Sequence, residues 1–299
     1  MQKTSKAVGD LGCEPLKNPS AMEVLCKDII RTWILPHLSA GTRGPDPTVD
    51  LLEVVECILY KLKTGCQWRL LPIKQFFTCE ALTWSGVYYP FNEWRKDGSW
   101  KKLWVTLLRL HKSRLDLSSV QLDGSHTRTH NGGAAIGYQG RKAARTTNLL
   151  FLADNQGQPL ACATPQAGNH HDLFDIEALF DELCDLVQEA QIRLDGLFLN
   201  ADSGFDAKVL REACFRRDIE ANIAHNPRSA PSAAAAAADH YFDAERYRQR
   251  TAIERTNAWL DSFKTLLVRY ETNVENWLAF HFLAFTVLLL RKIPPNEEP

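Results

Sequence analysis

The sequence predicts a mixed α/β protein, a five-stranded mixed sheet flanked by helices and preceded by a small all-α domain. Two observations predict this class. Apolar residues recur at helical spacing up to about residue 114, whereas from Leu115 onward short apolar runs alternate with amphipathic segments. The order after Leu115 is strand, strand, strand, helix, strand, helix, strand, helix, which suits a mixed sheet packed between helices.

The first part of the chain has helical periodicity. Residues 1–20 are polar and rich in Gly and Pro, and we expect a mobile tail there. In residues 21–114 we expect a helical DNA-binding domain, with helices over 21–38, 51–64, 79–94 and 100–112. Thr48 or Asp50 caps the second helix and Gly65 ends it, while Pro90 should kink or split the third. Aromatic and basic residues interleave near Trp94, so the bundle either binds DNA in a helix-turn-helix-like way or serves for packing or dimerisation.

The second part, residues 115–299, is predicted to hold the sheet and a C-terminal helix. Its strands are expected over 120–123, 148–154, 159–165, 194–202 and 219–225, with the first ending at Gly124 and a hairpin turn at 155–157. Helices are expected over 172–190, 207–217, 247–264 and 277–290, with Asp172 and Asp206 as N-caps. Residues 227–240 form a linker with an alanine run.

Three acidic residues stand out in this part. Asp123 and Asp202 follow apolar strands, where a carboxylate is costly to desolvate unless a cation compensates it. Glu254 lies in the polar row of the 247–264 helix, where a plain solvated surface is the alternative. Two Mg²⁺ or Mn²⁺ ions on carboxylates can clamp the attacking and leaving oxygens of a phosphodiester. The three acids together therefore predict a metal-dependent phosphodiester enzyme.

Basic residues form local clusters although the formal net charge is −1. Contacts to DNA must therefore come from such clusters rather than from bulk charge. One cluster surrounds the Gly-rich loop after the first strand, and the other surrounds the 247–264 helix; a solvated, salt-bridged surface is the alternative for both. The DNA-binding candidates are His126, Arg128, Arg141, Lys142, Tyr247, Arg250, Arg255 and Lys264. His126 either assists the site or lines the loop. A zinc site at His126 and His130 is disfavoured because the two follow a strand rather than share a helical face.

The cysteines and the apolar runs indicate the cellular compartment of the protein. No two cysteines have CxxC spacing, so we expect free thiols in a reducing compartment. The N-terminus carries no basic region followed by an apolar core, and the 277–290 run is shorter than the ~20 residues of a membrane span. We expect a cytoplasmic protein that does not contact the membrane.

Several motifs in order resemble one known family. They are Leu122-Asp-Gly-Ser-His-Thr-Arg, Gly137-Tyr-Gln-Gly-Arg-Lys, Ala167-Gly-Asn-His-His-Asp-Leu, Asn200-Ala-Asp-Ser-Gly-Phe-Asp and Ile253-Glu-Arg-Thr-Asn-Ala-Trp-Leu-Asp-Ser-Phe. With Gly65-Cys-Gln-Trp-Arg and Trp94-Arg-Lys-Asp-Gly-Ser-Trp, they are similar to bacterial insertion-sequence transposases of the insertion-sequence-five group, related to the insertion-sequence-four superfamily. The resemblance covers nearly the whole chain.

The resemblance implies a ribonuclease-H-like core with Asp123, Asp202 and Glu254 as its acidic triad. It implies Mg²⁺-dependent cleavage at terminal inverted repeats of double-stranded DNA, followed by strand transfer from the freed 3′-hydroxyl. It also implies a homodimer on DNA, because two ends must be synapsed, and association with the bacterial nucleoid. Two alternatives remain: a catalytically inactive, transposase-derived DNA-binding protein, and a metal-dependent nuclease without strand transfer.

One position departs from the family's pattern. Its Tyr-Arg-Glu-Lys signature matches Tyr247, Arg250 and Glu254, but Asp261 occupies the position of the final Lys. Lys264 lies about one helical turn further on and is the candidate substitute.

Overall fold

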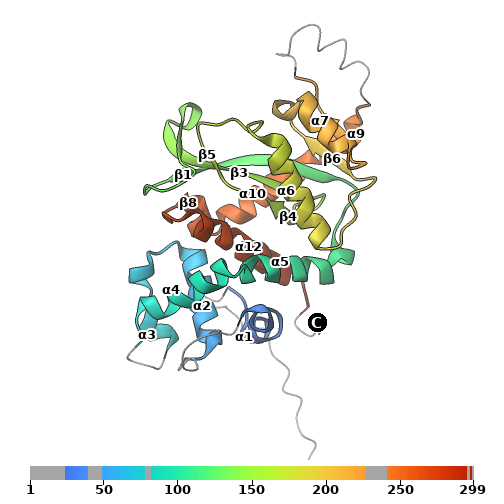
Figure 1. Ribbon diagram of the computed structural model, residues 1–299. Helices are drawn as coiled ribbons and strands as arrows, with labels where there is room; N and C mark the ends of the chain where they lie inside the picture. The colour runs from blue at the N-terminus through green and yellow to red at the C-terminus, as the bar shows by residue number, and fades with distance from the viewer. Residues whose placement is uncertain (1–23, 40–48, 78–81, 227–240, 295–296, 298–299) are drawn as a thin grey trace, which may run out of the picture.

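The computed structural model describes residues 24–39, 49–77, 82–226, 241–294 and 297. The expected tail over residues 1–20 and the linker over 227–240 lie outside the described residues. In Figure 1 the sheet lies at the top, the N-terminal helices at the bottom, and the long C-terminal helix runs between them.

The N-terminal part is helical, as the periodicity predicts. Asp50 caps the second helix, since its Oδ1 accepts a 2.9 Å hydrogen bond from the Leu52 amide. That helix ends at Gly65, whose φ of 70° suits a residue without a side chain. The elements are α1 (Lys27–Ile29), η1 (Ile30–Ile34), η2 (Leu35–His37), α2 (Leu51–Thr64), η3 (Trp68–Leu70), α3 (Ile73–Phe76), α4 (Trp84–Lys96), α5 (Ser99–Leu110) and η4 (Lys112–Arg114).

Pro90 does not split its helix, so of the kink or split that the sequence predicts, the split is wrong. It lies inside α4, which continues to Lys96 and buries Val87, Phe91 and Trp94. A proline inside a helix costs about 3 kcal/mol. Burial of each large apolar side chain stabilises by about 1.5–3 kcal/mol, so the three together outweigh that cost.

The sheet has the strand order of a ribonuclease-H-like fold. β1 (Val120–Thr129) pairs antiparallel with β3 (Ala144–Asp154), and β3 pairs antiparallel with β4 (Pro159–Cys162). On the other side, β1 pairs parallel with β6 (Phe198–Ala201), and β6 pairs parallel with β7 (Glu220–Ile223). The main order is therefore β4-β3-β1-β6-β7. Short strands β2 (Gly137–Gln139), β5 (Gln166–Ala167) and β8 (Val268–Arg269) extend its edges.

Three of the predictions that bear on the site were wrong. β1 does not end at Gly124 but continues to Thr129, so Asp123 lies within the strand rather than at its end. The next helix, α6 (Ile176–Glu189), begins after Asp172, and α7 (Lys208–Phe215) begins after Asp206. Asp172 and Asp206 are therefore not N-caps. Their carboxylates make tertiary contacts instead, and Asp206 forms a 2.8 Å ion pair with Arg211.

The helix that carries Glu254 is present in segments. After η6 (Ser203–Phe205), α7 and β7, the chain forms α9 (Ala244–Arg248), the 3-10 turn η7 (Gln249–Thr251), α10 (Ala252–Asp261) and α11 (Lys264–Leu267). One face of this segment is buried at Ala252, Ile253, Thr256, Leu260, Phe263 and Leu266. The opposite row leaves Glu254 and Asp261 exposed. This amphipathic pattern seats α10 against β1 and β3.

The C-terminal helix joins the two parts of the chain. α12 (Val274–Leu290) packs against α5 and β4, and its residues from Asn276 to Leu290 are buried with the exception of Leu278. The buried residues of the N-terminal helices and of the sheet form one hydrophobic cluster around it. No helix within the described ranges is both long and apolar enough to cross a membrane.

Candidate active site

Asp123 and Asp202 meet on neighbouring parallel strands. β1 and β6 pair Val120 with Leu199 and Gln121 with Asn200. Continuing this register two residues further sets Asp123 opposite Asp202, which directly follows β6. Asp202 is held in a tight turn, because its carboxylate accepts a 2.8 Å hydrogen bond from the Gly204 amide. The ends of parallel strands are where α/β sheets gather their sites.

Asp123 sits in an environment that disfavours its charge. Burial, followed by the nearby charges of Asp202 and Asp172, raises the pKa of this carboxyl to about 6. Two groups oppose the rise: the Gly124 amide, which donates a 2.9 Å hydrogen bond to Asp123 Oδ1, and the positive charge of Arg250. A carboxylate destabilised by its own acidic neighbours is stabilised when a cation binds among them.

The helix α10 reaches Asp123 through Asn257. Its Nδ2 donates a 3.4 Å hydrogen bond to Asp123 Oδ2. Glu254 lies one helical turn before Asn257 and is exposed, so the same helix presents it beside the strand. Arg250 belongs to the η7 turn that leads into α10. The elements thus bring Asp123, Asp202 and Arg250 together, and Glu254 lies on the same face of α10 as Asn257.

The residues fit a hard divalent cation at Asp123 and Asp202. Both are carboxylates, the donor type that Mg²⁺ and Mn²⁺ prefer. Within the described part of the chain, no three His, Cys, Asp or Glu side chains are grouped closely enough to hold a metal ion. Glu254 therefore does not close a three-carboxylate shell in this conformation.

Asp172 belongs to this region, although the sequence pattern assigned it to a helix cap. Its Oδ1 accepts a 2.7 Å hydrogen bond from Asn148 Nδ2 and lies 3.8 Å from His126 Nε2. A Cβ atom at Gly124 would come within 2.4 Å of the same oxygen. The loop before α6 therefore presses Asp172 onto β1, on the face opposite the Asp123 side chain. The signal that identifies it is Gly124 itself, a strand glycine that marks a close approach.

Four of the predicted DNA-binding residues come together. The Lys142 Nζ donates a 2.5 Å hydrogen bond to the His126 carbonyl, and Arg128 donates to the Lys142 carbonyl at 3.4 Å. Arg141 lies beside Lys142 in η5 (Gly140–Lys142), and both are exposed. His126 is half-buried, and burial lowers its pKa. These residues form a basic turn next to the β1 segment that follows Asp123.

The other four are dispersed. Arg250 lies near Asp123, whereas the exposed Arg255 donates to the carbonyls of Gln156 and Asn155 in the β3–β4 turn. Tyr247 packs against Phe242, and Lys264 begins α11, far along the helix from Tyr247. Arg269, a further base that follows α11, is fully buried and donates a 2.6 Å hydrogen bond to Thr147 Oγ1. It is a structural residue rather than a surface base.

The comparisons with known proteins agree with this architecture. Residues 115–290 match the model of the transposase DDE domain. Because that match covers more than half of the chain, the chain belongs to the transposase DDE domain family, and it is a polynucleotidyl transferase and endonuclease by class. Residues 30–104 match a second family model, which is described as a transposase of the IS4/5 family (DUF4096). A search of the curated proteins found no match.

Solved structures of Mos1 transposase are distant neighbours. The strand transfer complex is 12% identical, with 85% of this chain and 81% of that chain covered at a TM-score of 0.27. The paired-end complex with the left transposon end is 12% identical, with 85% and 82% covered at 0.28. The paired-end complex with Mn is 13% identical, with 85% and 82% covered at 0.27.

Proposed function

We propose that this transposase cleaves the ends of its element at terminal inverted repeats and joins the freed 3′-hydroxyl to target DNA by two-metal phosphodiester transfer. The observation that supports this most is the juxtaposition of Asp123 and Asp202 on neighbouring parallel strands. Asp123 is desolvated and surrounded by acids, the state that binding of a divalent cation relieves.

Each side chain has a distinct role in the proposal. Asp123 and Asp202 would hold the divalent ions. Bound Mg²⁺ or Mn²⁺ supplies a nucleophile at neutral pH and neutralises developing charge on the phosphate oxygens. Asn257 orients the Asp123 carboxylate through its 3.4 Å hydrogen bond. Arg250 adds positive charge where the scissile phosphate approaches.

DNA contacts would come from both parts of the chain. His126, Arg128, Arg141 and Lys142 would hold the backbone beside the site, with Tyr247, Arg255 and Lys264 along the α9–α11 side. Lys264 would replace the family's signature Lys, whose position Asp261 occupies. Residues 21–114 would recognise the ends and residues 115–299 would perform the chemistry, as a homodimer in the bacterial nucleoid.

The test is Mg²⁺-dependent nicking of a labelled fragment that carries the element's own terminal repeat. We expect cleavage by the wild type and a rate lower by about 100-fold or more for Asp123→Asn and Glu254→Gln, since each loses a metal ligand. Glu275→Gln, which changes an exposed helical glutamate on α12, should cleave at the wild-type rate. Equal cleavage by all four proteins would refute the triad.

A second candidate has one observation in its favour. Because Glu254 does not close a three-carboxylate cluster in the described conformation, a transposase-derived DNA-binding protein without activity is the alternative. It predicts metal-independent binding of the fragment and no nicking by any variant. A third outcome, nicking without joining in a strand-transfer assay, would identify a metal-dependent nuclease.

A further inference from the structure

A row of buried amides runs across the three neighbouring strands β1, β6 and β7. Gln121 in β1, Asn200 in β6 and Asn222 in β7 are register partners in neighbouring strands, so their side chains share one face. All three residues are fully buried. Polar side chains in central strands are costly unless their hydrogen bonds are satisfied, so the partners of this row indicate its purpose.

Two of the amides bond to the backbone of one segment. The Asn222 side chain donates to the Asp243 carbonyl at 2.9 Å and accepts from the Asp243 amide at 2.8 Å. It also donates to Asn200 Oδ1 at 2.7 Å, and Asn200 Nδ2 donates to the Arg246 carbonyl at 3.0 Å. The row therefore holds main-chain groups at both ends of the first turn of α9.

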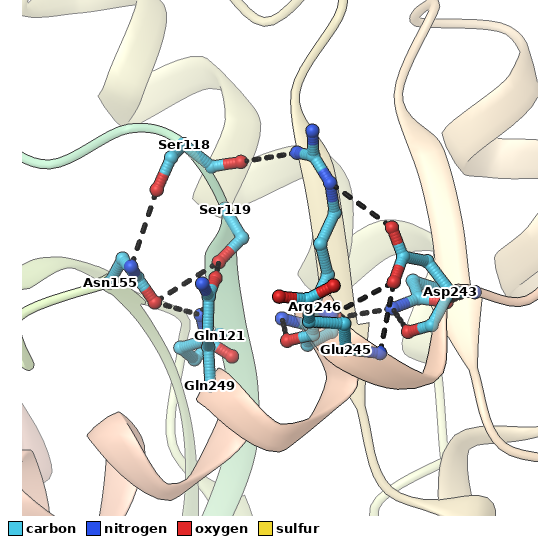
Figure 2. A network of polar contacts seen from close by, with 10 residues as sticks. Ser118, Ser119, Gln121, Asn155, Asp243, Glu245, Arg246 and Gln249 are labelled. Carbon is cyan, nitrogen blue, oxygen red and sulfur yellow. Dashed lines mark hydrogen bonds and ion pairs between the residues drawn. The ribbon is translucent and has the colours of Figure 1, made fainter.

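The third amide holds the next turn through a serine. Gln121 Nε2 donates to Ser119 Oγ at 2.9 Å, and Ser119 Oγ donates to Gln249 Oε1 at 3.0 Å (Figure 2). Figure 2 also shows the side chain of Arg246, which connects the segment to Ser118. Its guanidinium donates to the Ser118 carbonyl at 3.0 Å and pairs with Asp243 at 3.3 Å.

Besides these hydrogen bonds, the segment 243–249 has two ring contacts: the Arg246 guanidinium lies 4.0 Å from the centre of the Phe198 ring, and Tyr247 packs against Phe242. None of the five residues of α9 is buried, so little apolar burial stabilises it. A helix this short is not stable by itself in water, since isolated helices below about 12 residues are marginal. Yet it leads without a break into η7, which carries Arg250, and into α10, which carries Glu254. A shift of one residue in this segment would rotate the following helix by about 100°.

We propose that Gln121, Asn200 and Asn222 are positioning residues that seat the 243–249 segment and thereby set Arg250 and Glu254 relative to Asp123. Gln121 lies two residues before Asp123 and Asn200 two before Asp202, so the same two strands carry both the acids and the seat. The inference rests on the proposed function in one respect, the assignment of Arg250 and Glu254 to the active site. The hydrogen bonds that hold the 243–249 segment do not depend on that assignment.

The test compares Asn200→Leu and Asn222→Leu, which keep side-chain volume but remove the hydrogen bonds, with the surface variant Gln249→Ala. Asn276→Leu is the matched control, because Asn276 is a buried amide on α12 with one hydrogen bond, to the Tyr88 hydroxyl. Amide hydrogen exchange is measured by mass spectrometry on peptides covering residues 243–262. DNA affinity and the nicking rate are measured on the same proteins.

We expect exchange of the 243–254 amides to accelerate by about 10-fold or more in both Leu variants and by less in Gln249→Ala, with other peptides unchanged. The nicking rate at saturating DNA should fall by at least about 10-fold, because positioning acts on the chemical step. The control should leave exchange in this segment unchanged. Should a Leu variant fail to fold, Gln249→Ala and the remaining variant decide the question.

The two failures are distinguishable. Unchanged exchange of 243–254, or faster exchange with a wild-type nicking rate, would overturn the positioning role and leave the proposed function intact. A wild-type protein that never nicks, with exchange that still responds to Asn222→Leu, would overturn the proposed function and support the seat.

Discussion

At the scale of single residues, Gly124 and Asp172 explain each other. The carboxylate of Asp172 fills the space where any other residue at position 124 would place its Cβ, 2.4 Å away. It is held there by Asn148, itself buried. The amide of Gly124 in turn donates to Asp123 Oδ1. Gly124 therefore contacts both acids, Asp172 on one face of β1 and Asp123 on the other.

This pairing predicts the effect of Gly124→Ala. The added methyl group must displace Asp172, and we expect a loss of about 1–3 kcal/mol in the free energy of unfolding, as for other overpacked sites. In urea titrations, the double variant Gly124→Ala with Asp172→Ala should recover most of that loss, since the second substitution removes the clashing atoms. Additive losses from the two substitutions would show that they do not interact.

The sequence pattern identifies Asp123 and Asp202 as site residues but not Asp172. The first two follow apolar runs, where an acid is conspicuous in a one-dimensional pattern. Asp172 precedes an amphipathic helix, where an acid has an ordinary role as a cap. Only the pairing of β1 with β3, which brings Asn148 opposite His126, shows that this loop is folded back onto the strand.

At the scale of elements, the turn from β2 through η5 to β3 is a basic arm beside the acids. Arg141 and Lys142 are exposed on it, and the Lys142 Nζ already contacts β1 at the His126 carbonyl. Its position next to the site follows from the long antiparallel pairing of β1 with β3. The sequence showed the charges and the glycines of this loop but not the strand β2 within it.

We expect Arg141→Ala and Lys142→Ala to weaken DNA binding equally for different sequences. Each lost phosphate contact should reduce the slope of log K against log salt by about 0.9. Binding measured between low and moderate salt would show this. Arg193→Ala serves as the control, because Arg193 is exposed and paired with Asp195 in its own loop. If the slope of log K against log salt is unchanged in both variants, the basic arm does not contact the DNA.

The helix α12 gives the fold a dependence on pH. Burial lowers the pKa of His281 from 6.5 to about 4, although a 3.0 Å hydrogen bond from its Nδ1 to the Trp277 carbonyl opposes this. The depressed pKa means that the folded state keeps His281 neutral while the unfolded state gains a proton below pH 6.5. Stability is therefore present above 6.5 and is lost as the pH falls toward about 4.

Thermal unfolding at pH 7.5 and pH 5 tests this dependence. Each pKa unit corresponds to about 1.4 kcal/mol, so the titration of His281 lowers the free energy of unfolding at pH 5 by about 2 kcal/mol. The variant His281→Leu should show a smaller difference in Tm between the two pH values than the wild type. An equal difference in both proteins would mean that other groups govern the acid sensitivity.

At the scale of the whole molecule, the helical part and the sheet are joined by buried polar contacts as well as by a common core. Lys61 of α2 forms a 3.0 Å ion pair with Glu271, both nearly inaccessible, and Trp68 Nε1 donates to the same carboxylate at 3.1 Å. Such a pair adds little net stability but is costly to break, so it specifies one arrangement of the two parts. The periodicity of the sequence predicted both parts correctly and could not show this junction, because Lys61 and Glu271 are 210 residues apart.

The central claim is that Asp123 and Asp202 hold a divalent cation beside α10. It is tested most directly by adding Fe²⁺ with ascorbate and peroxide, and by mapping where hydroxyl radicals formed at the bound iron cut the chain. The account predicts cuts near Asp123 and Asp202 and within α10 near Glu254, all suppressed by excess Mg²⁺ and absent in Asp123→Asn. Cuts elsewhere, or cuts that persist in that variant, would contradict it.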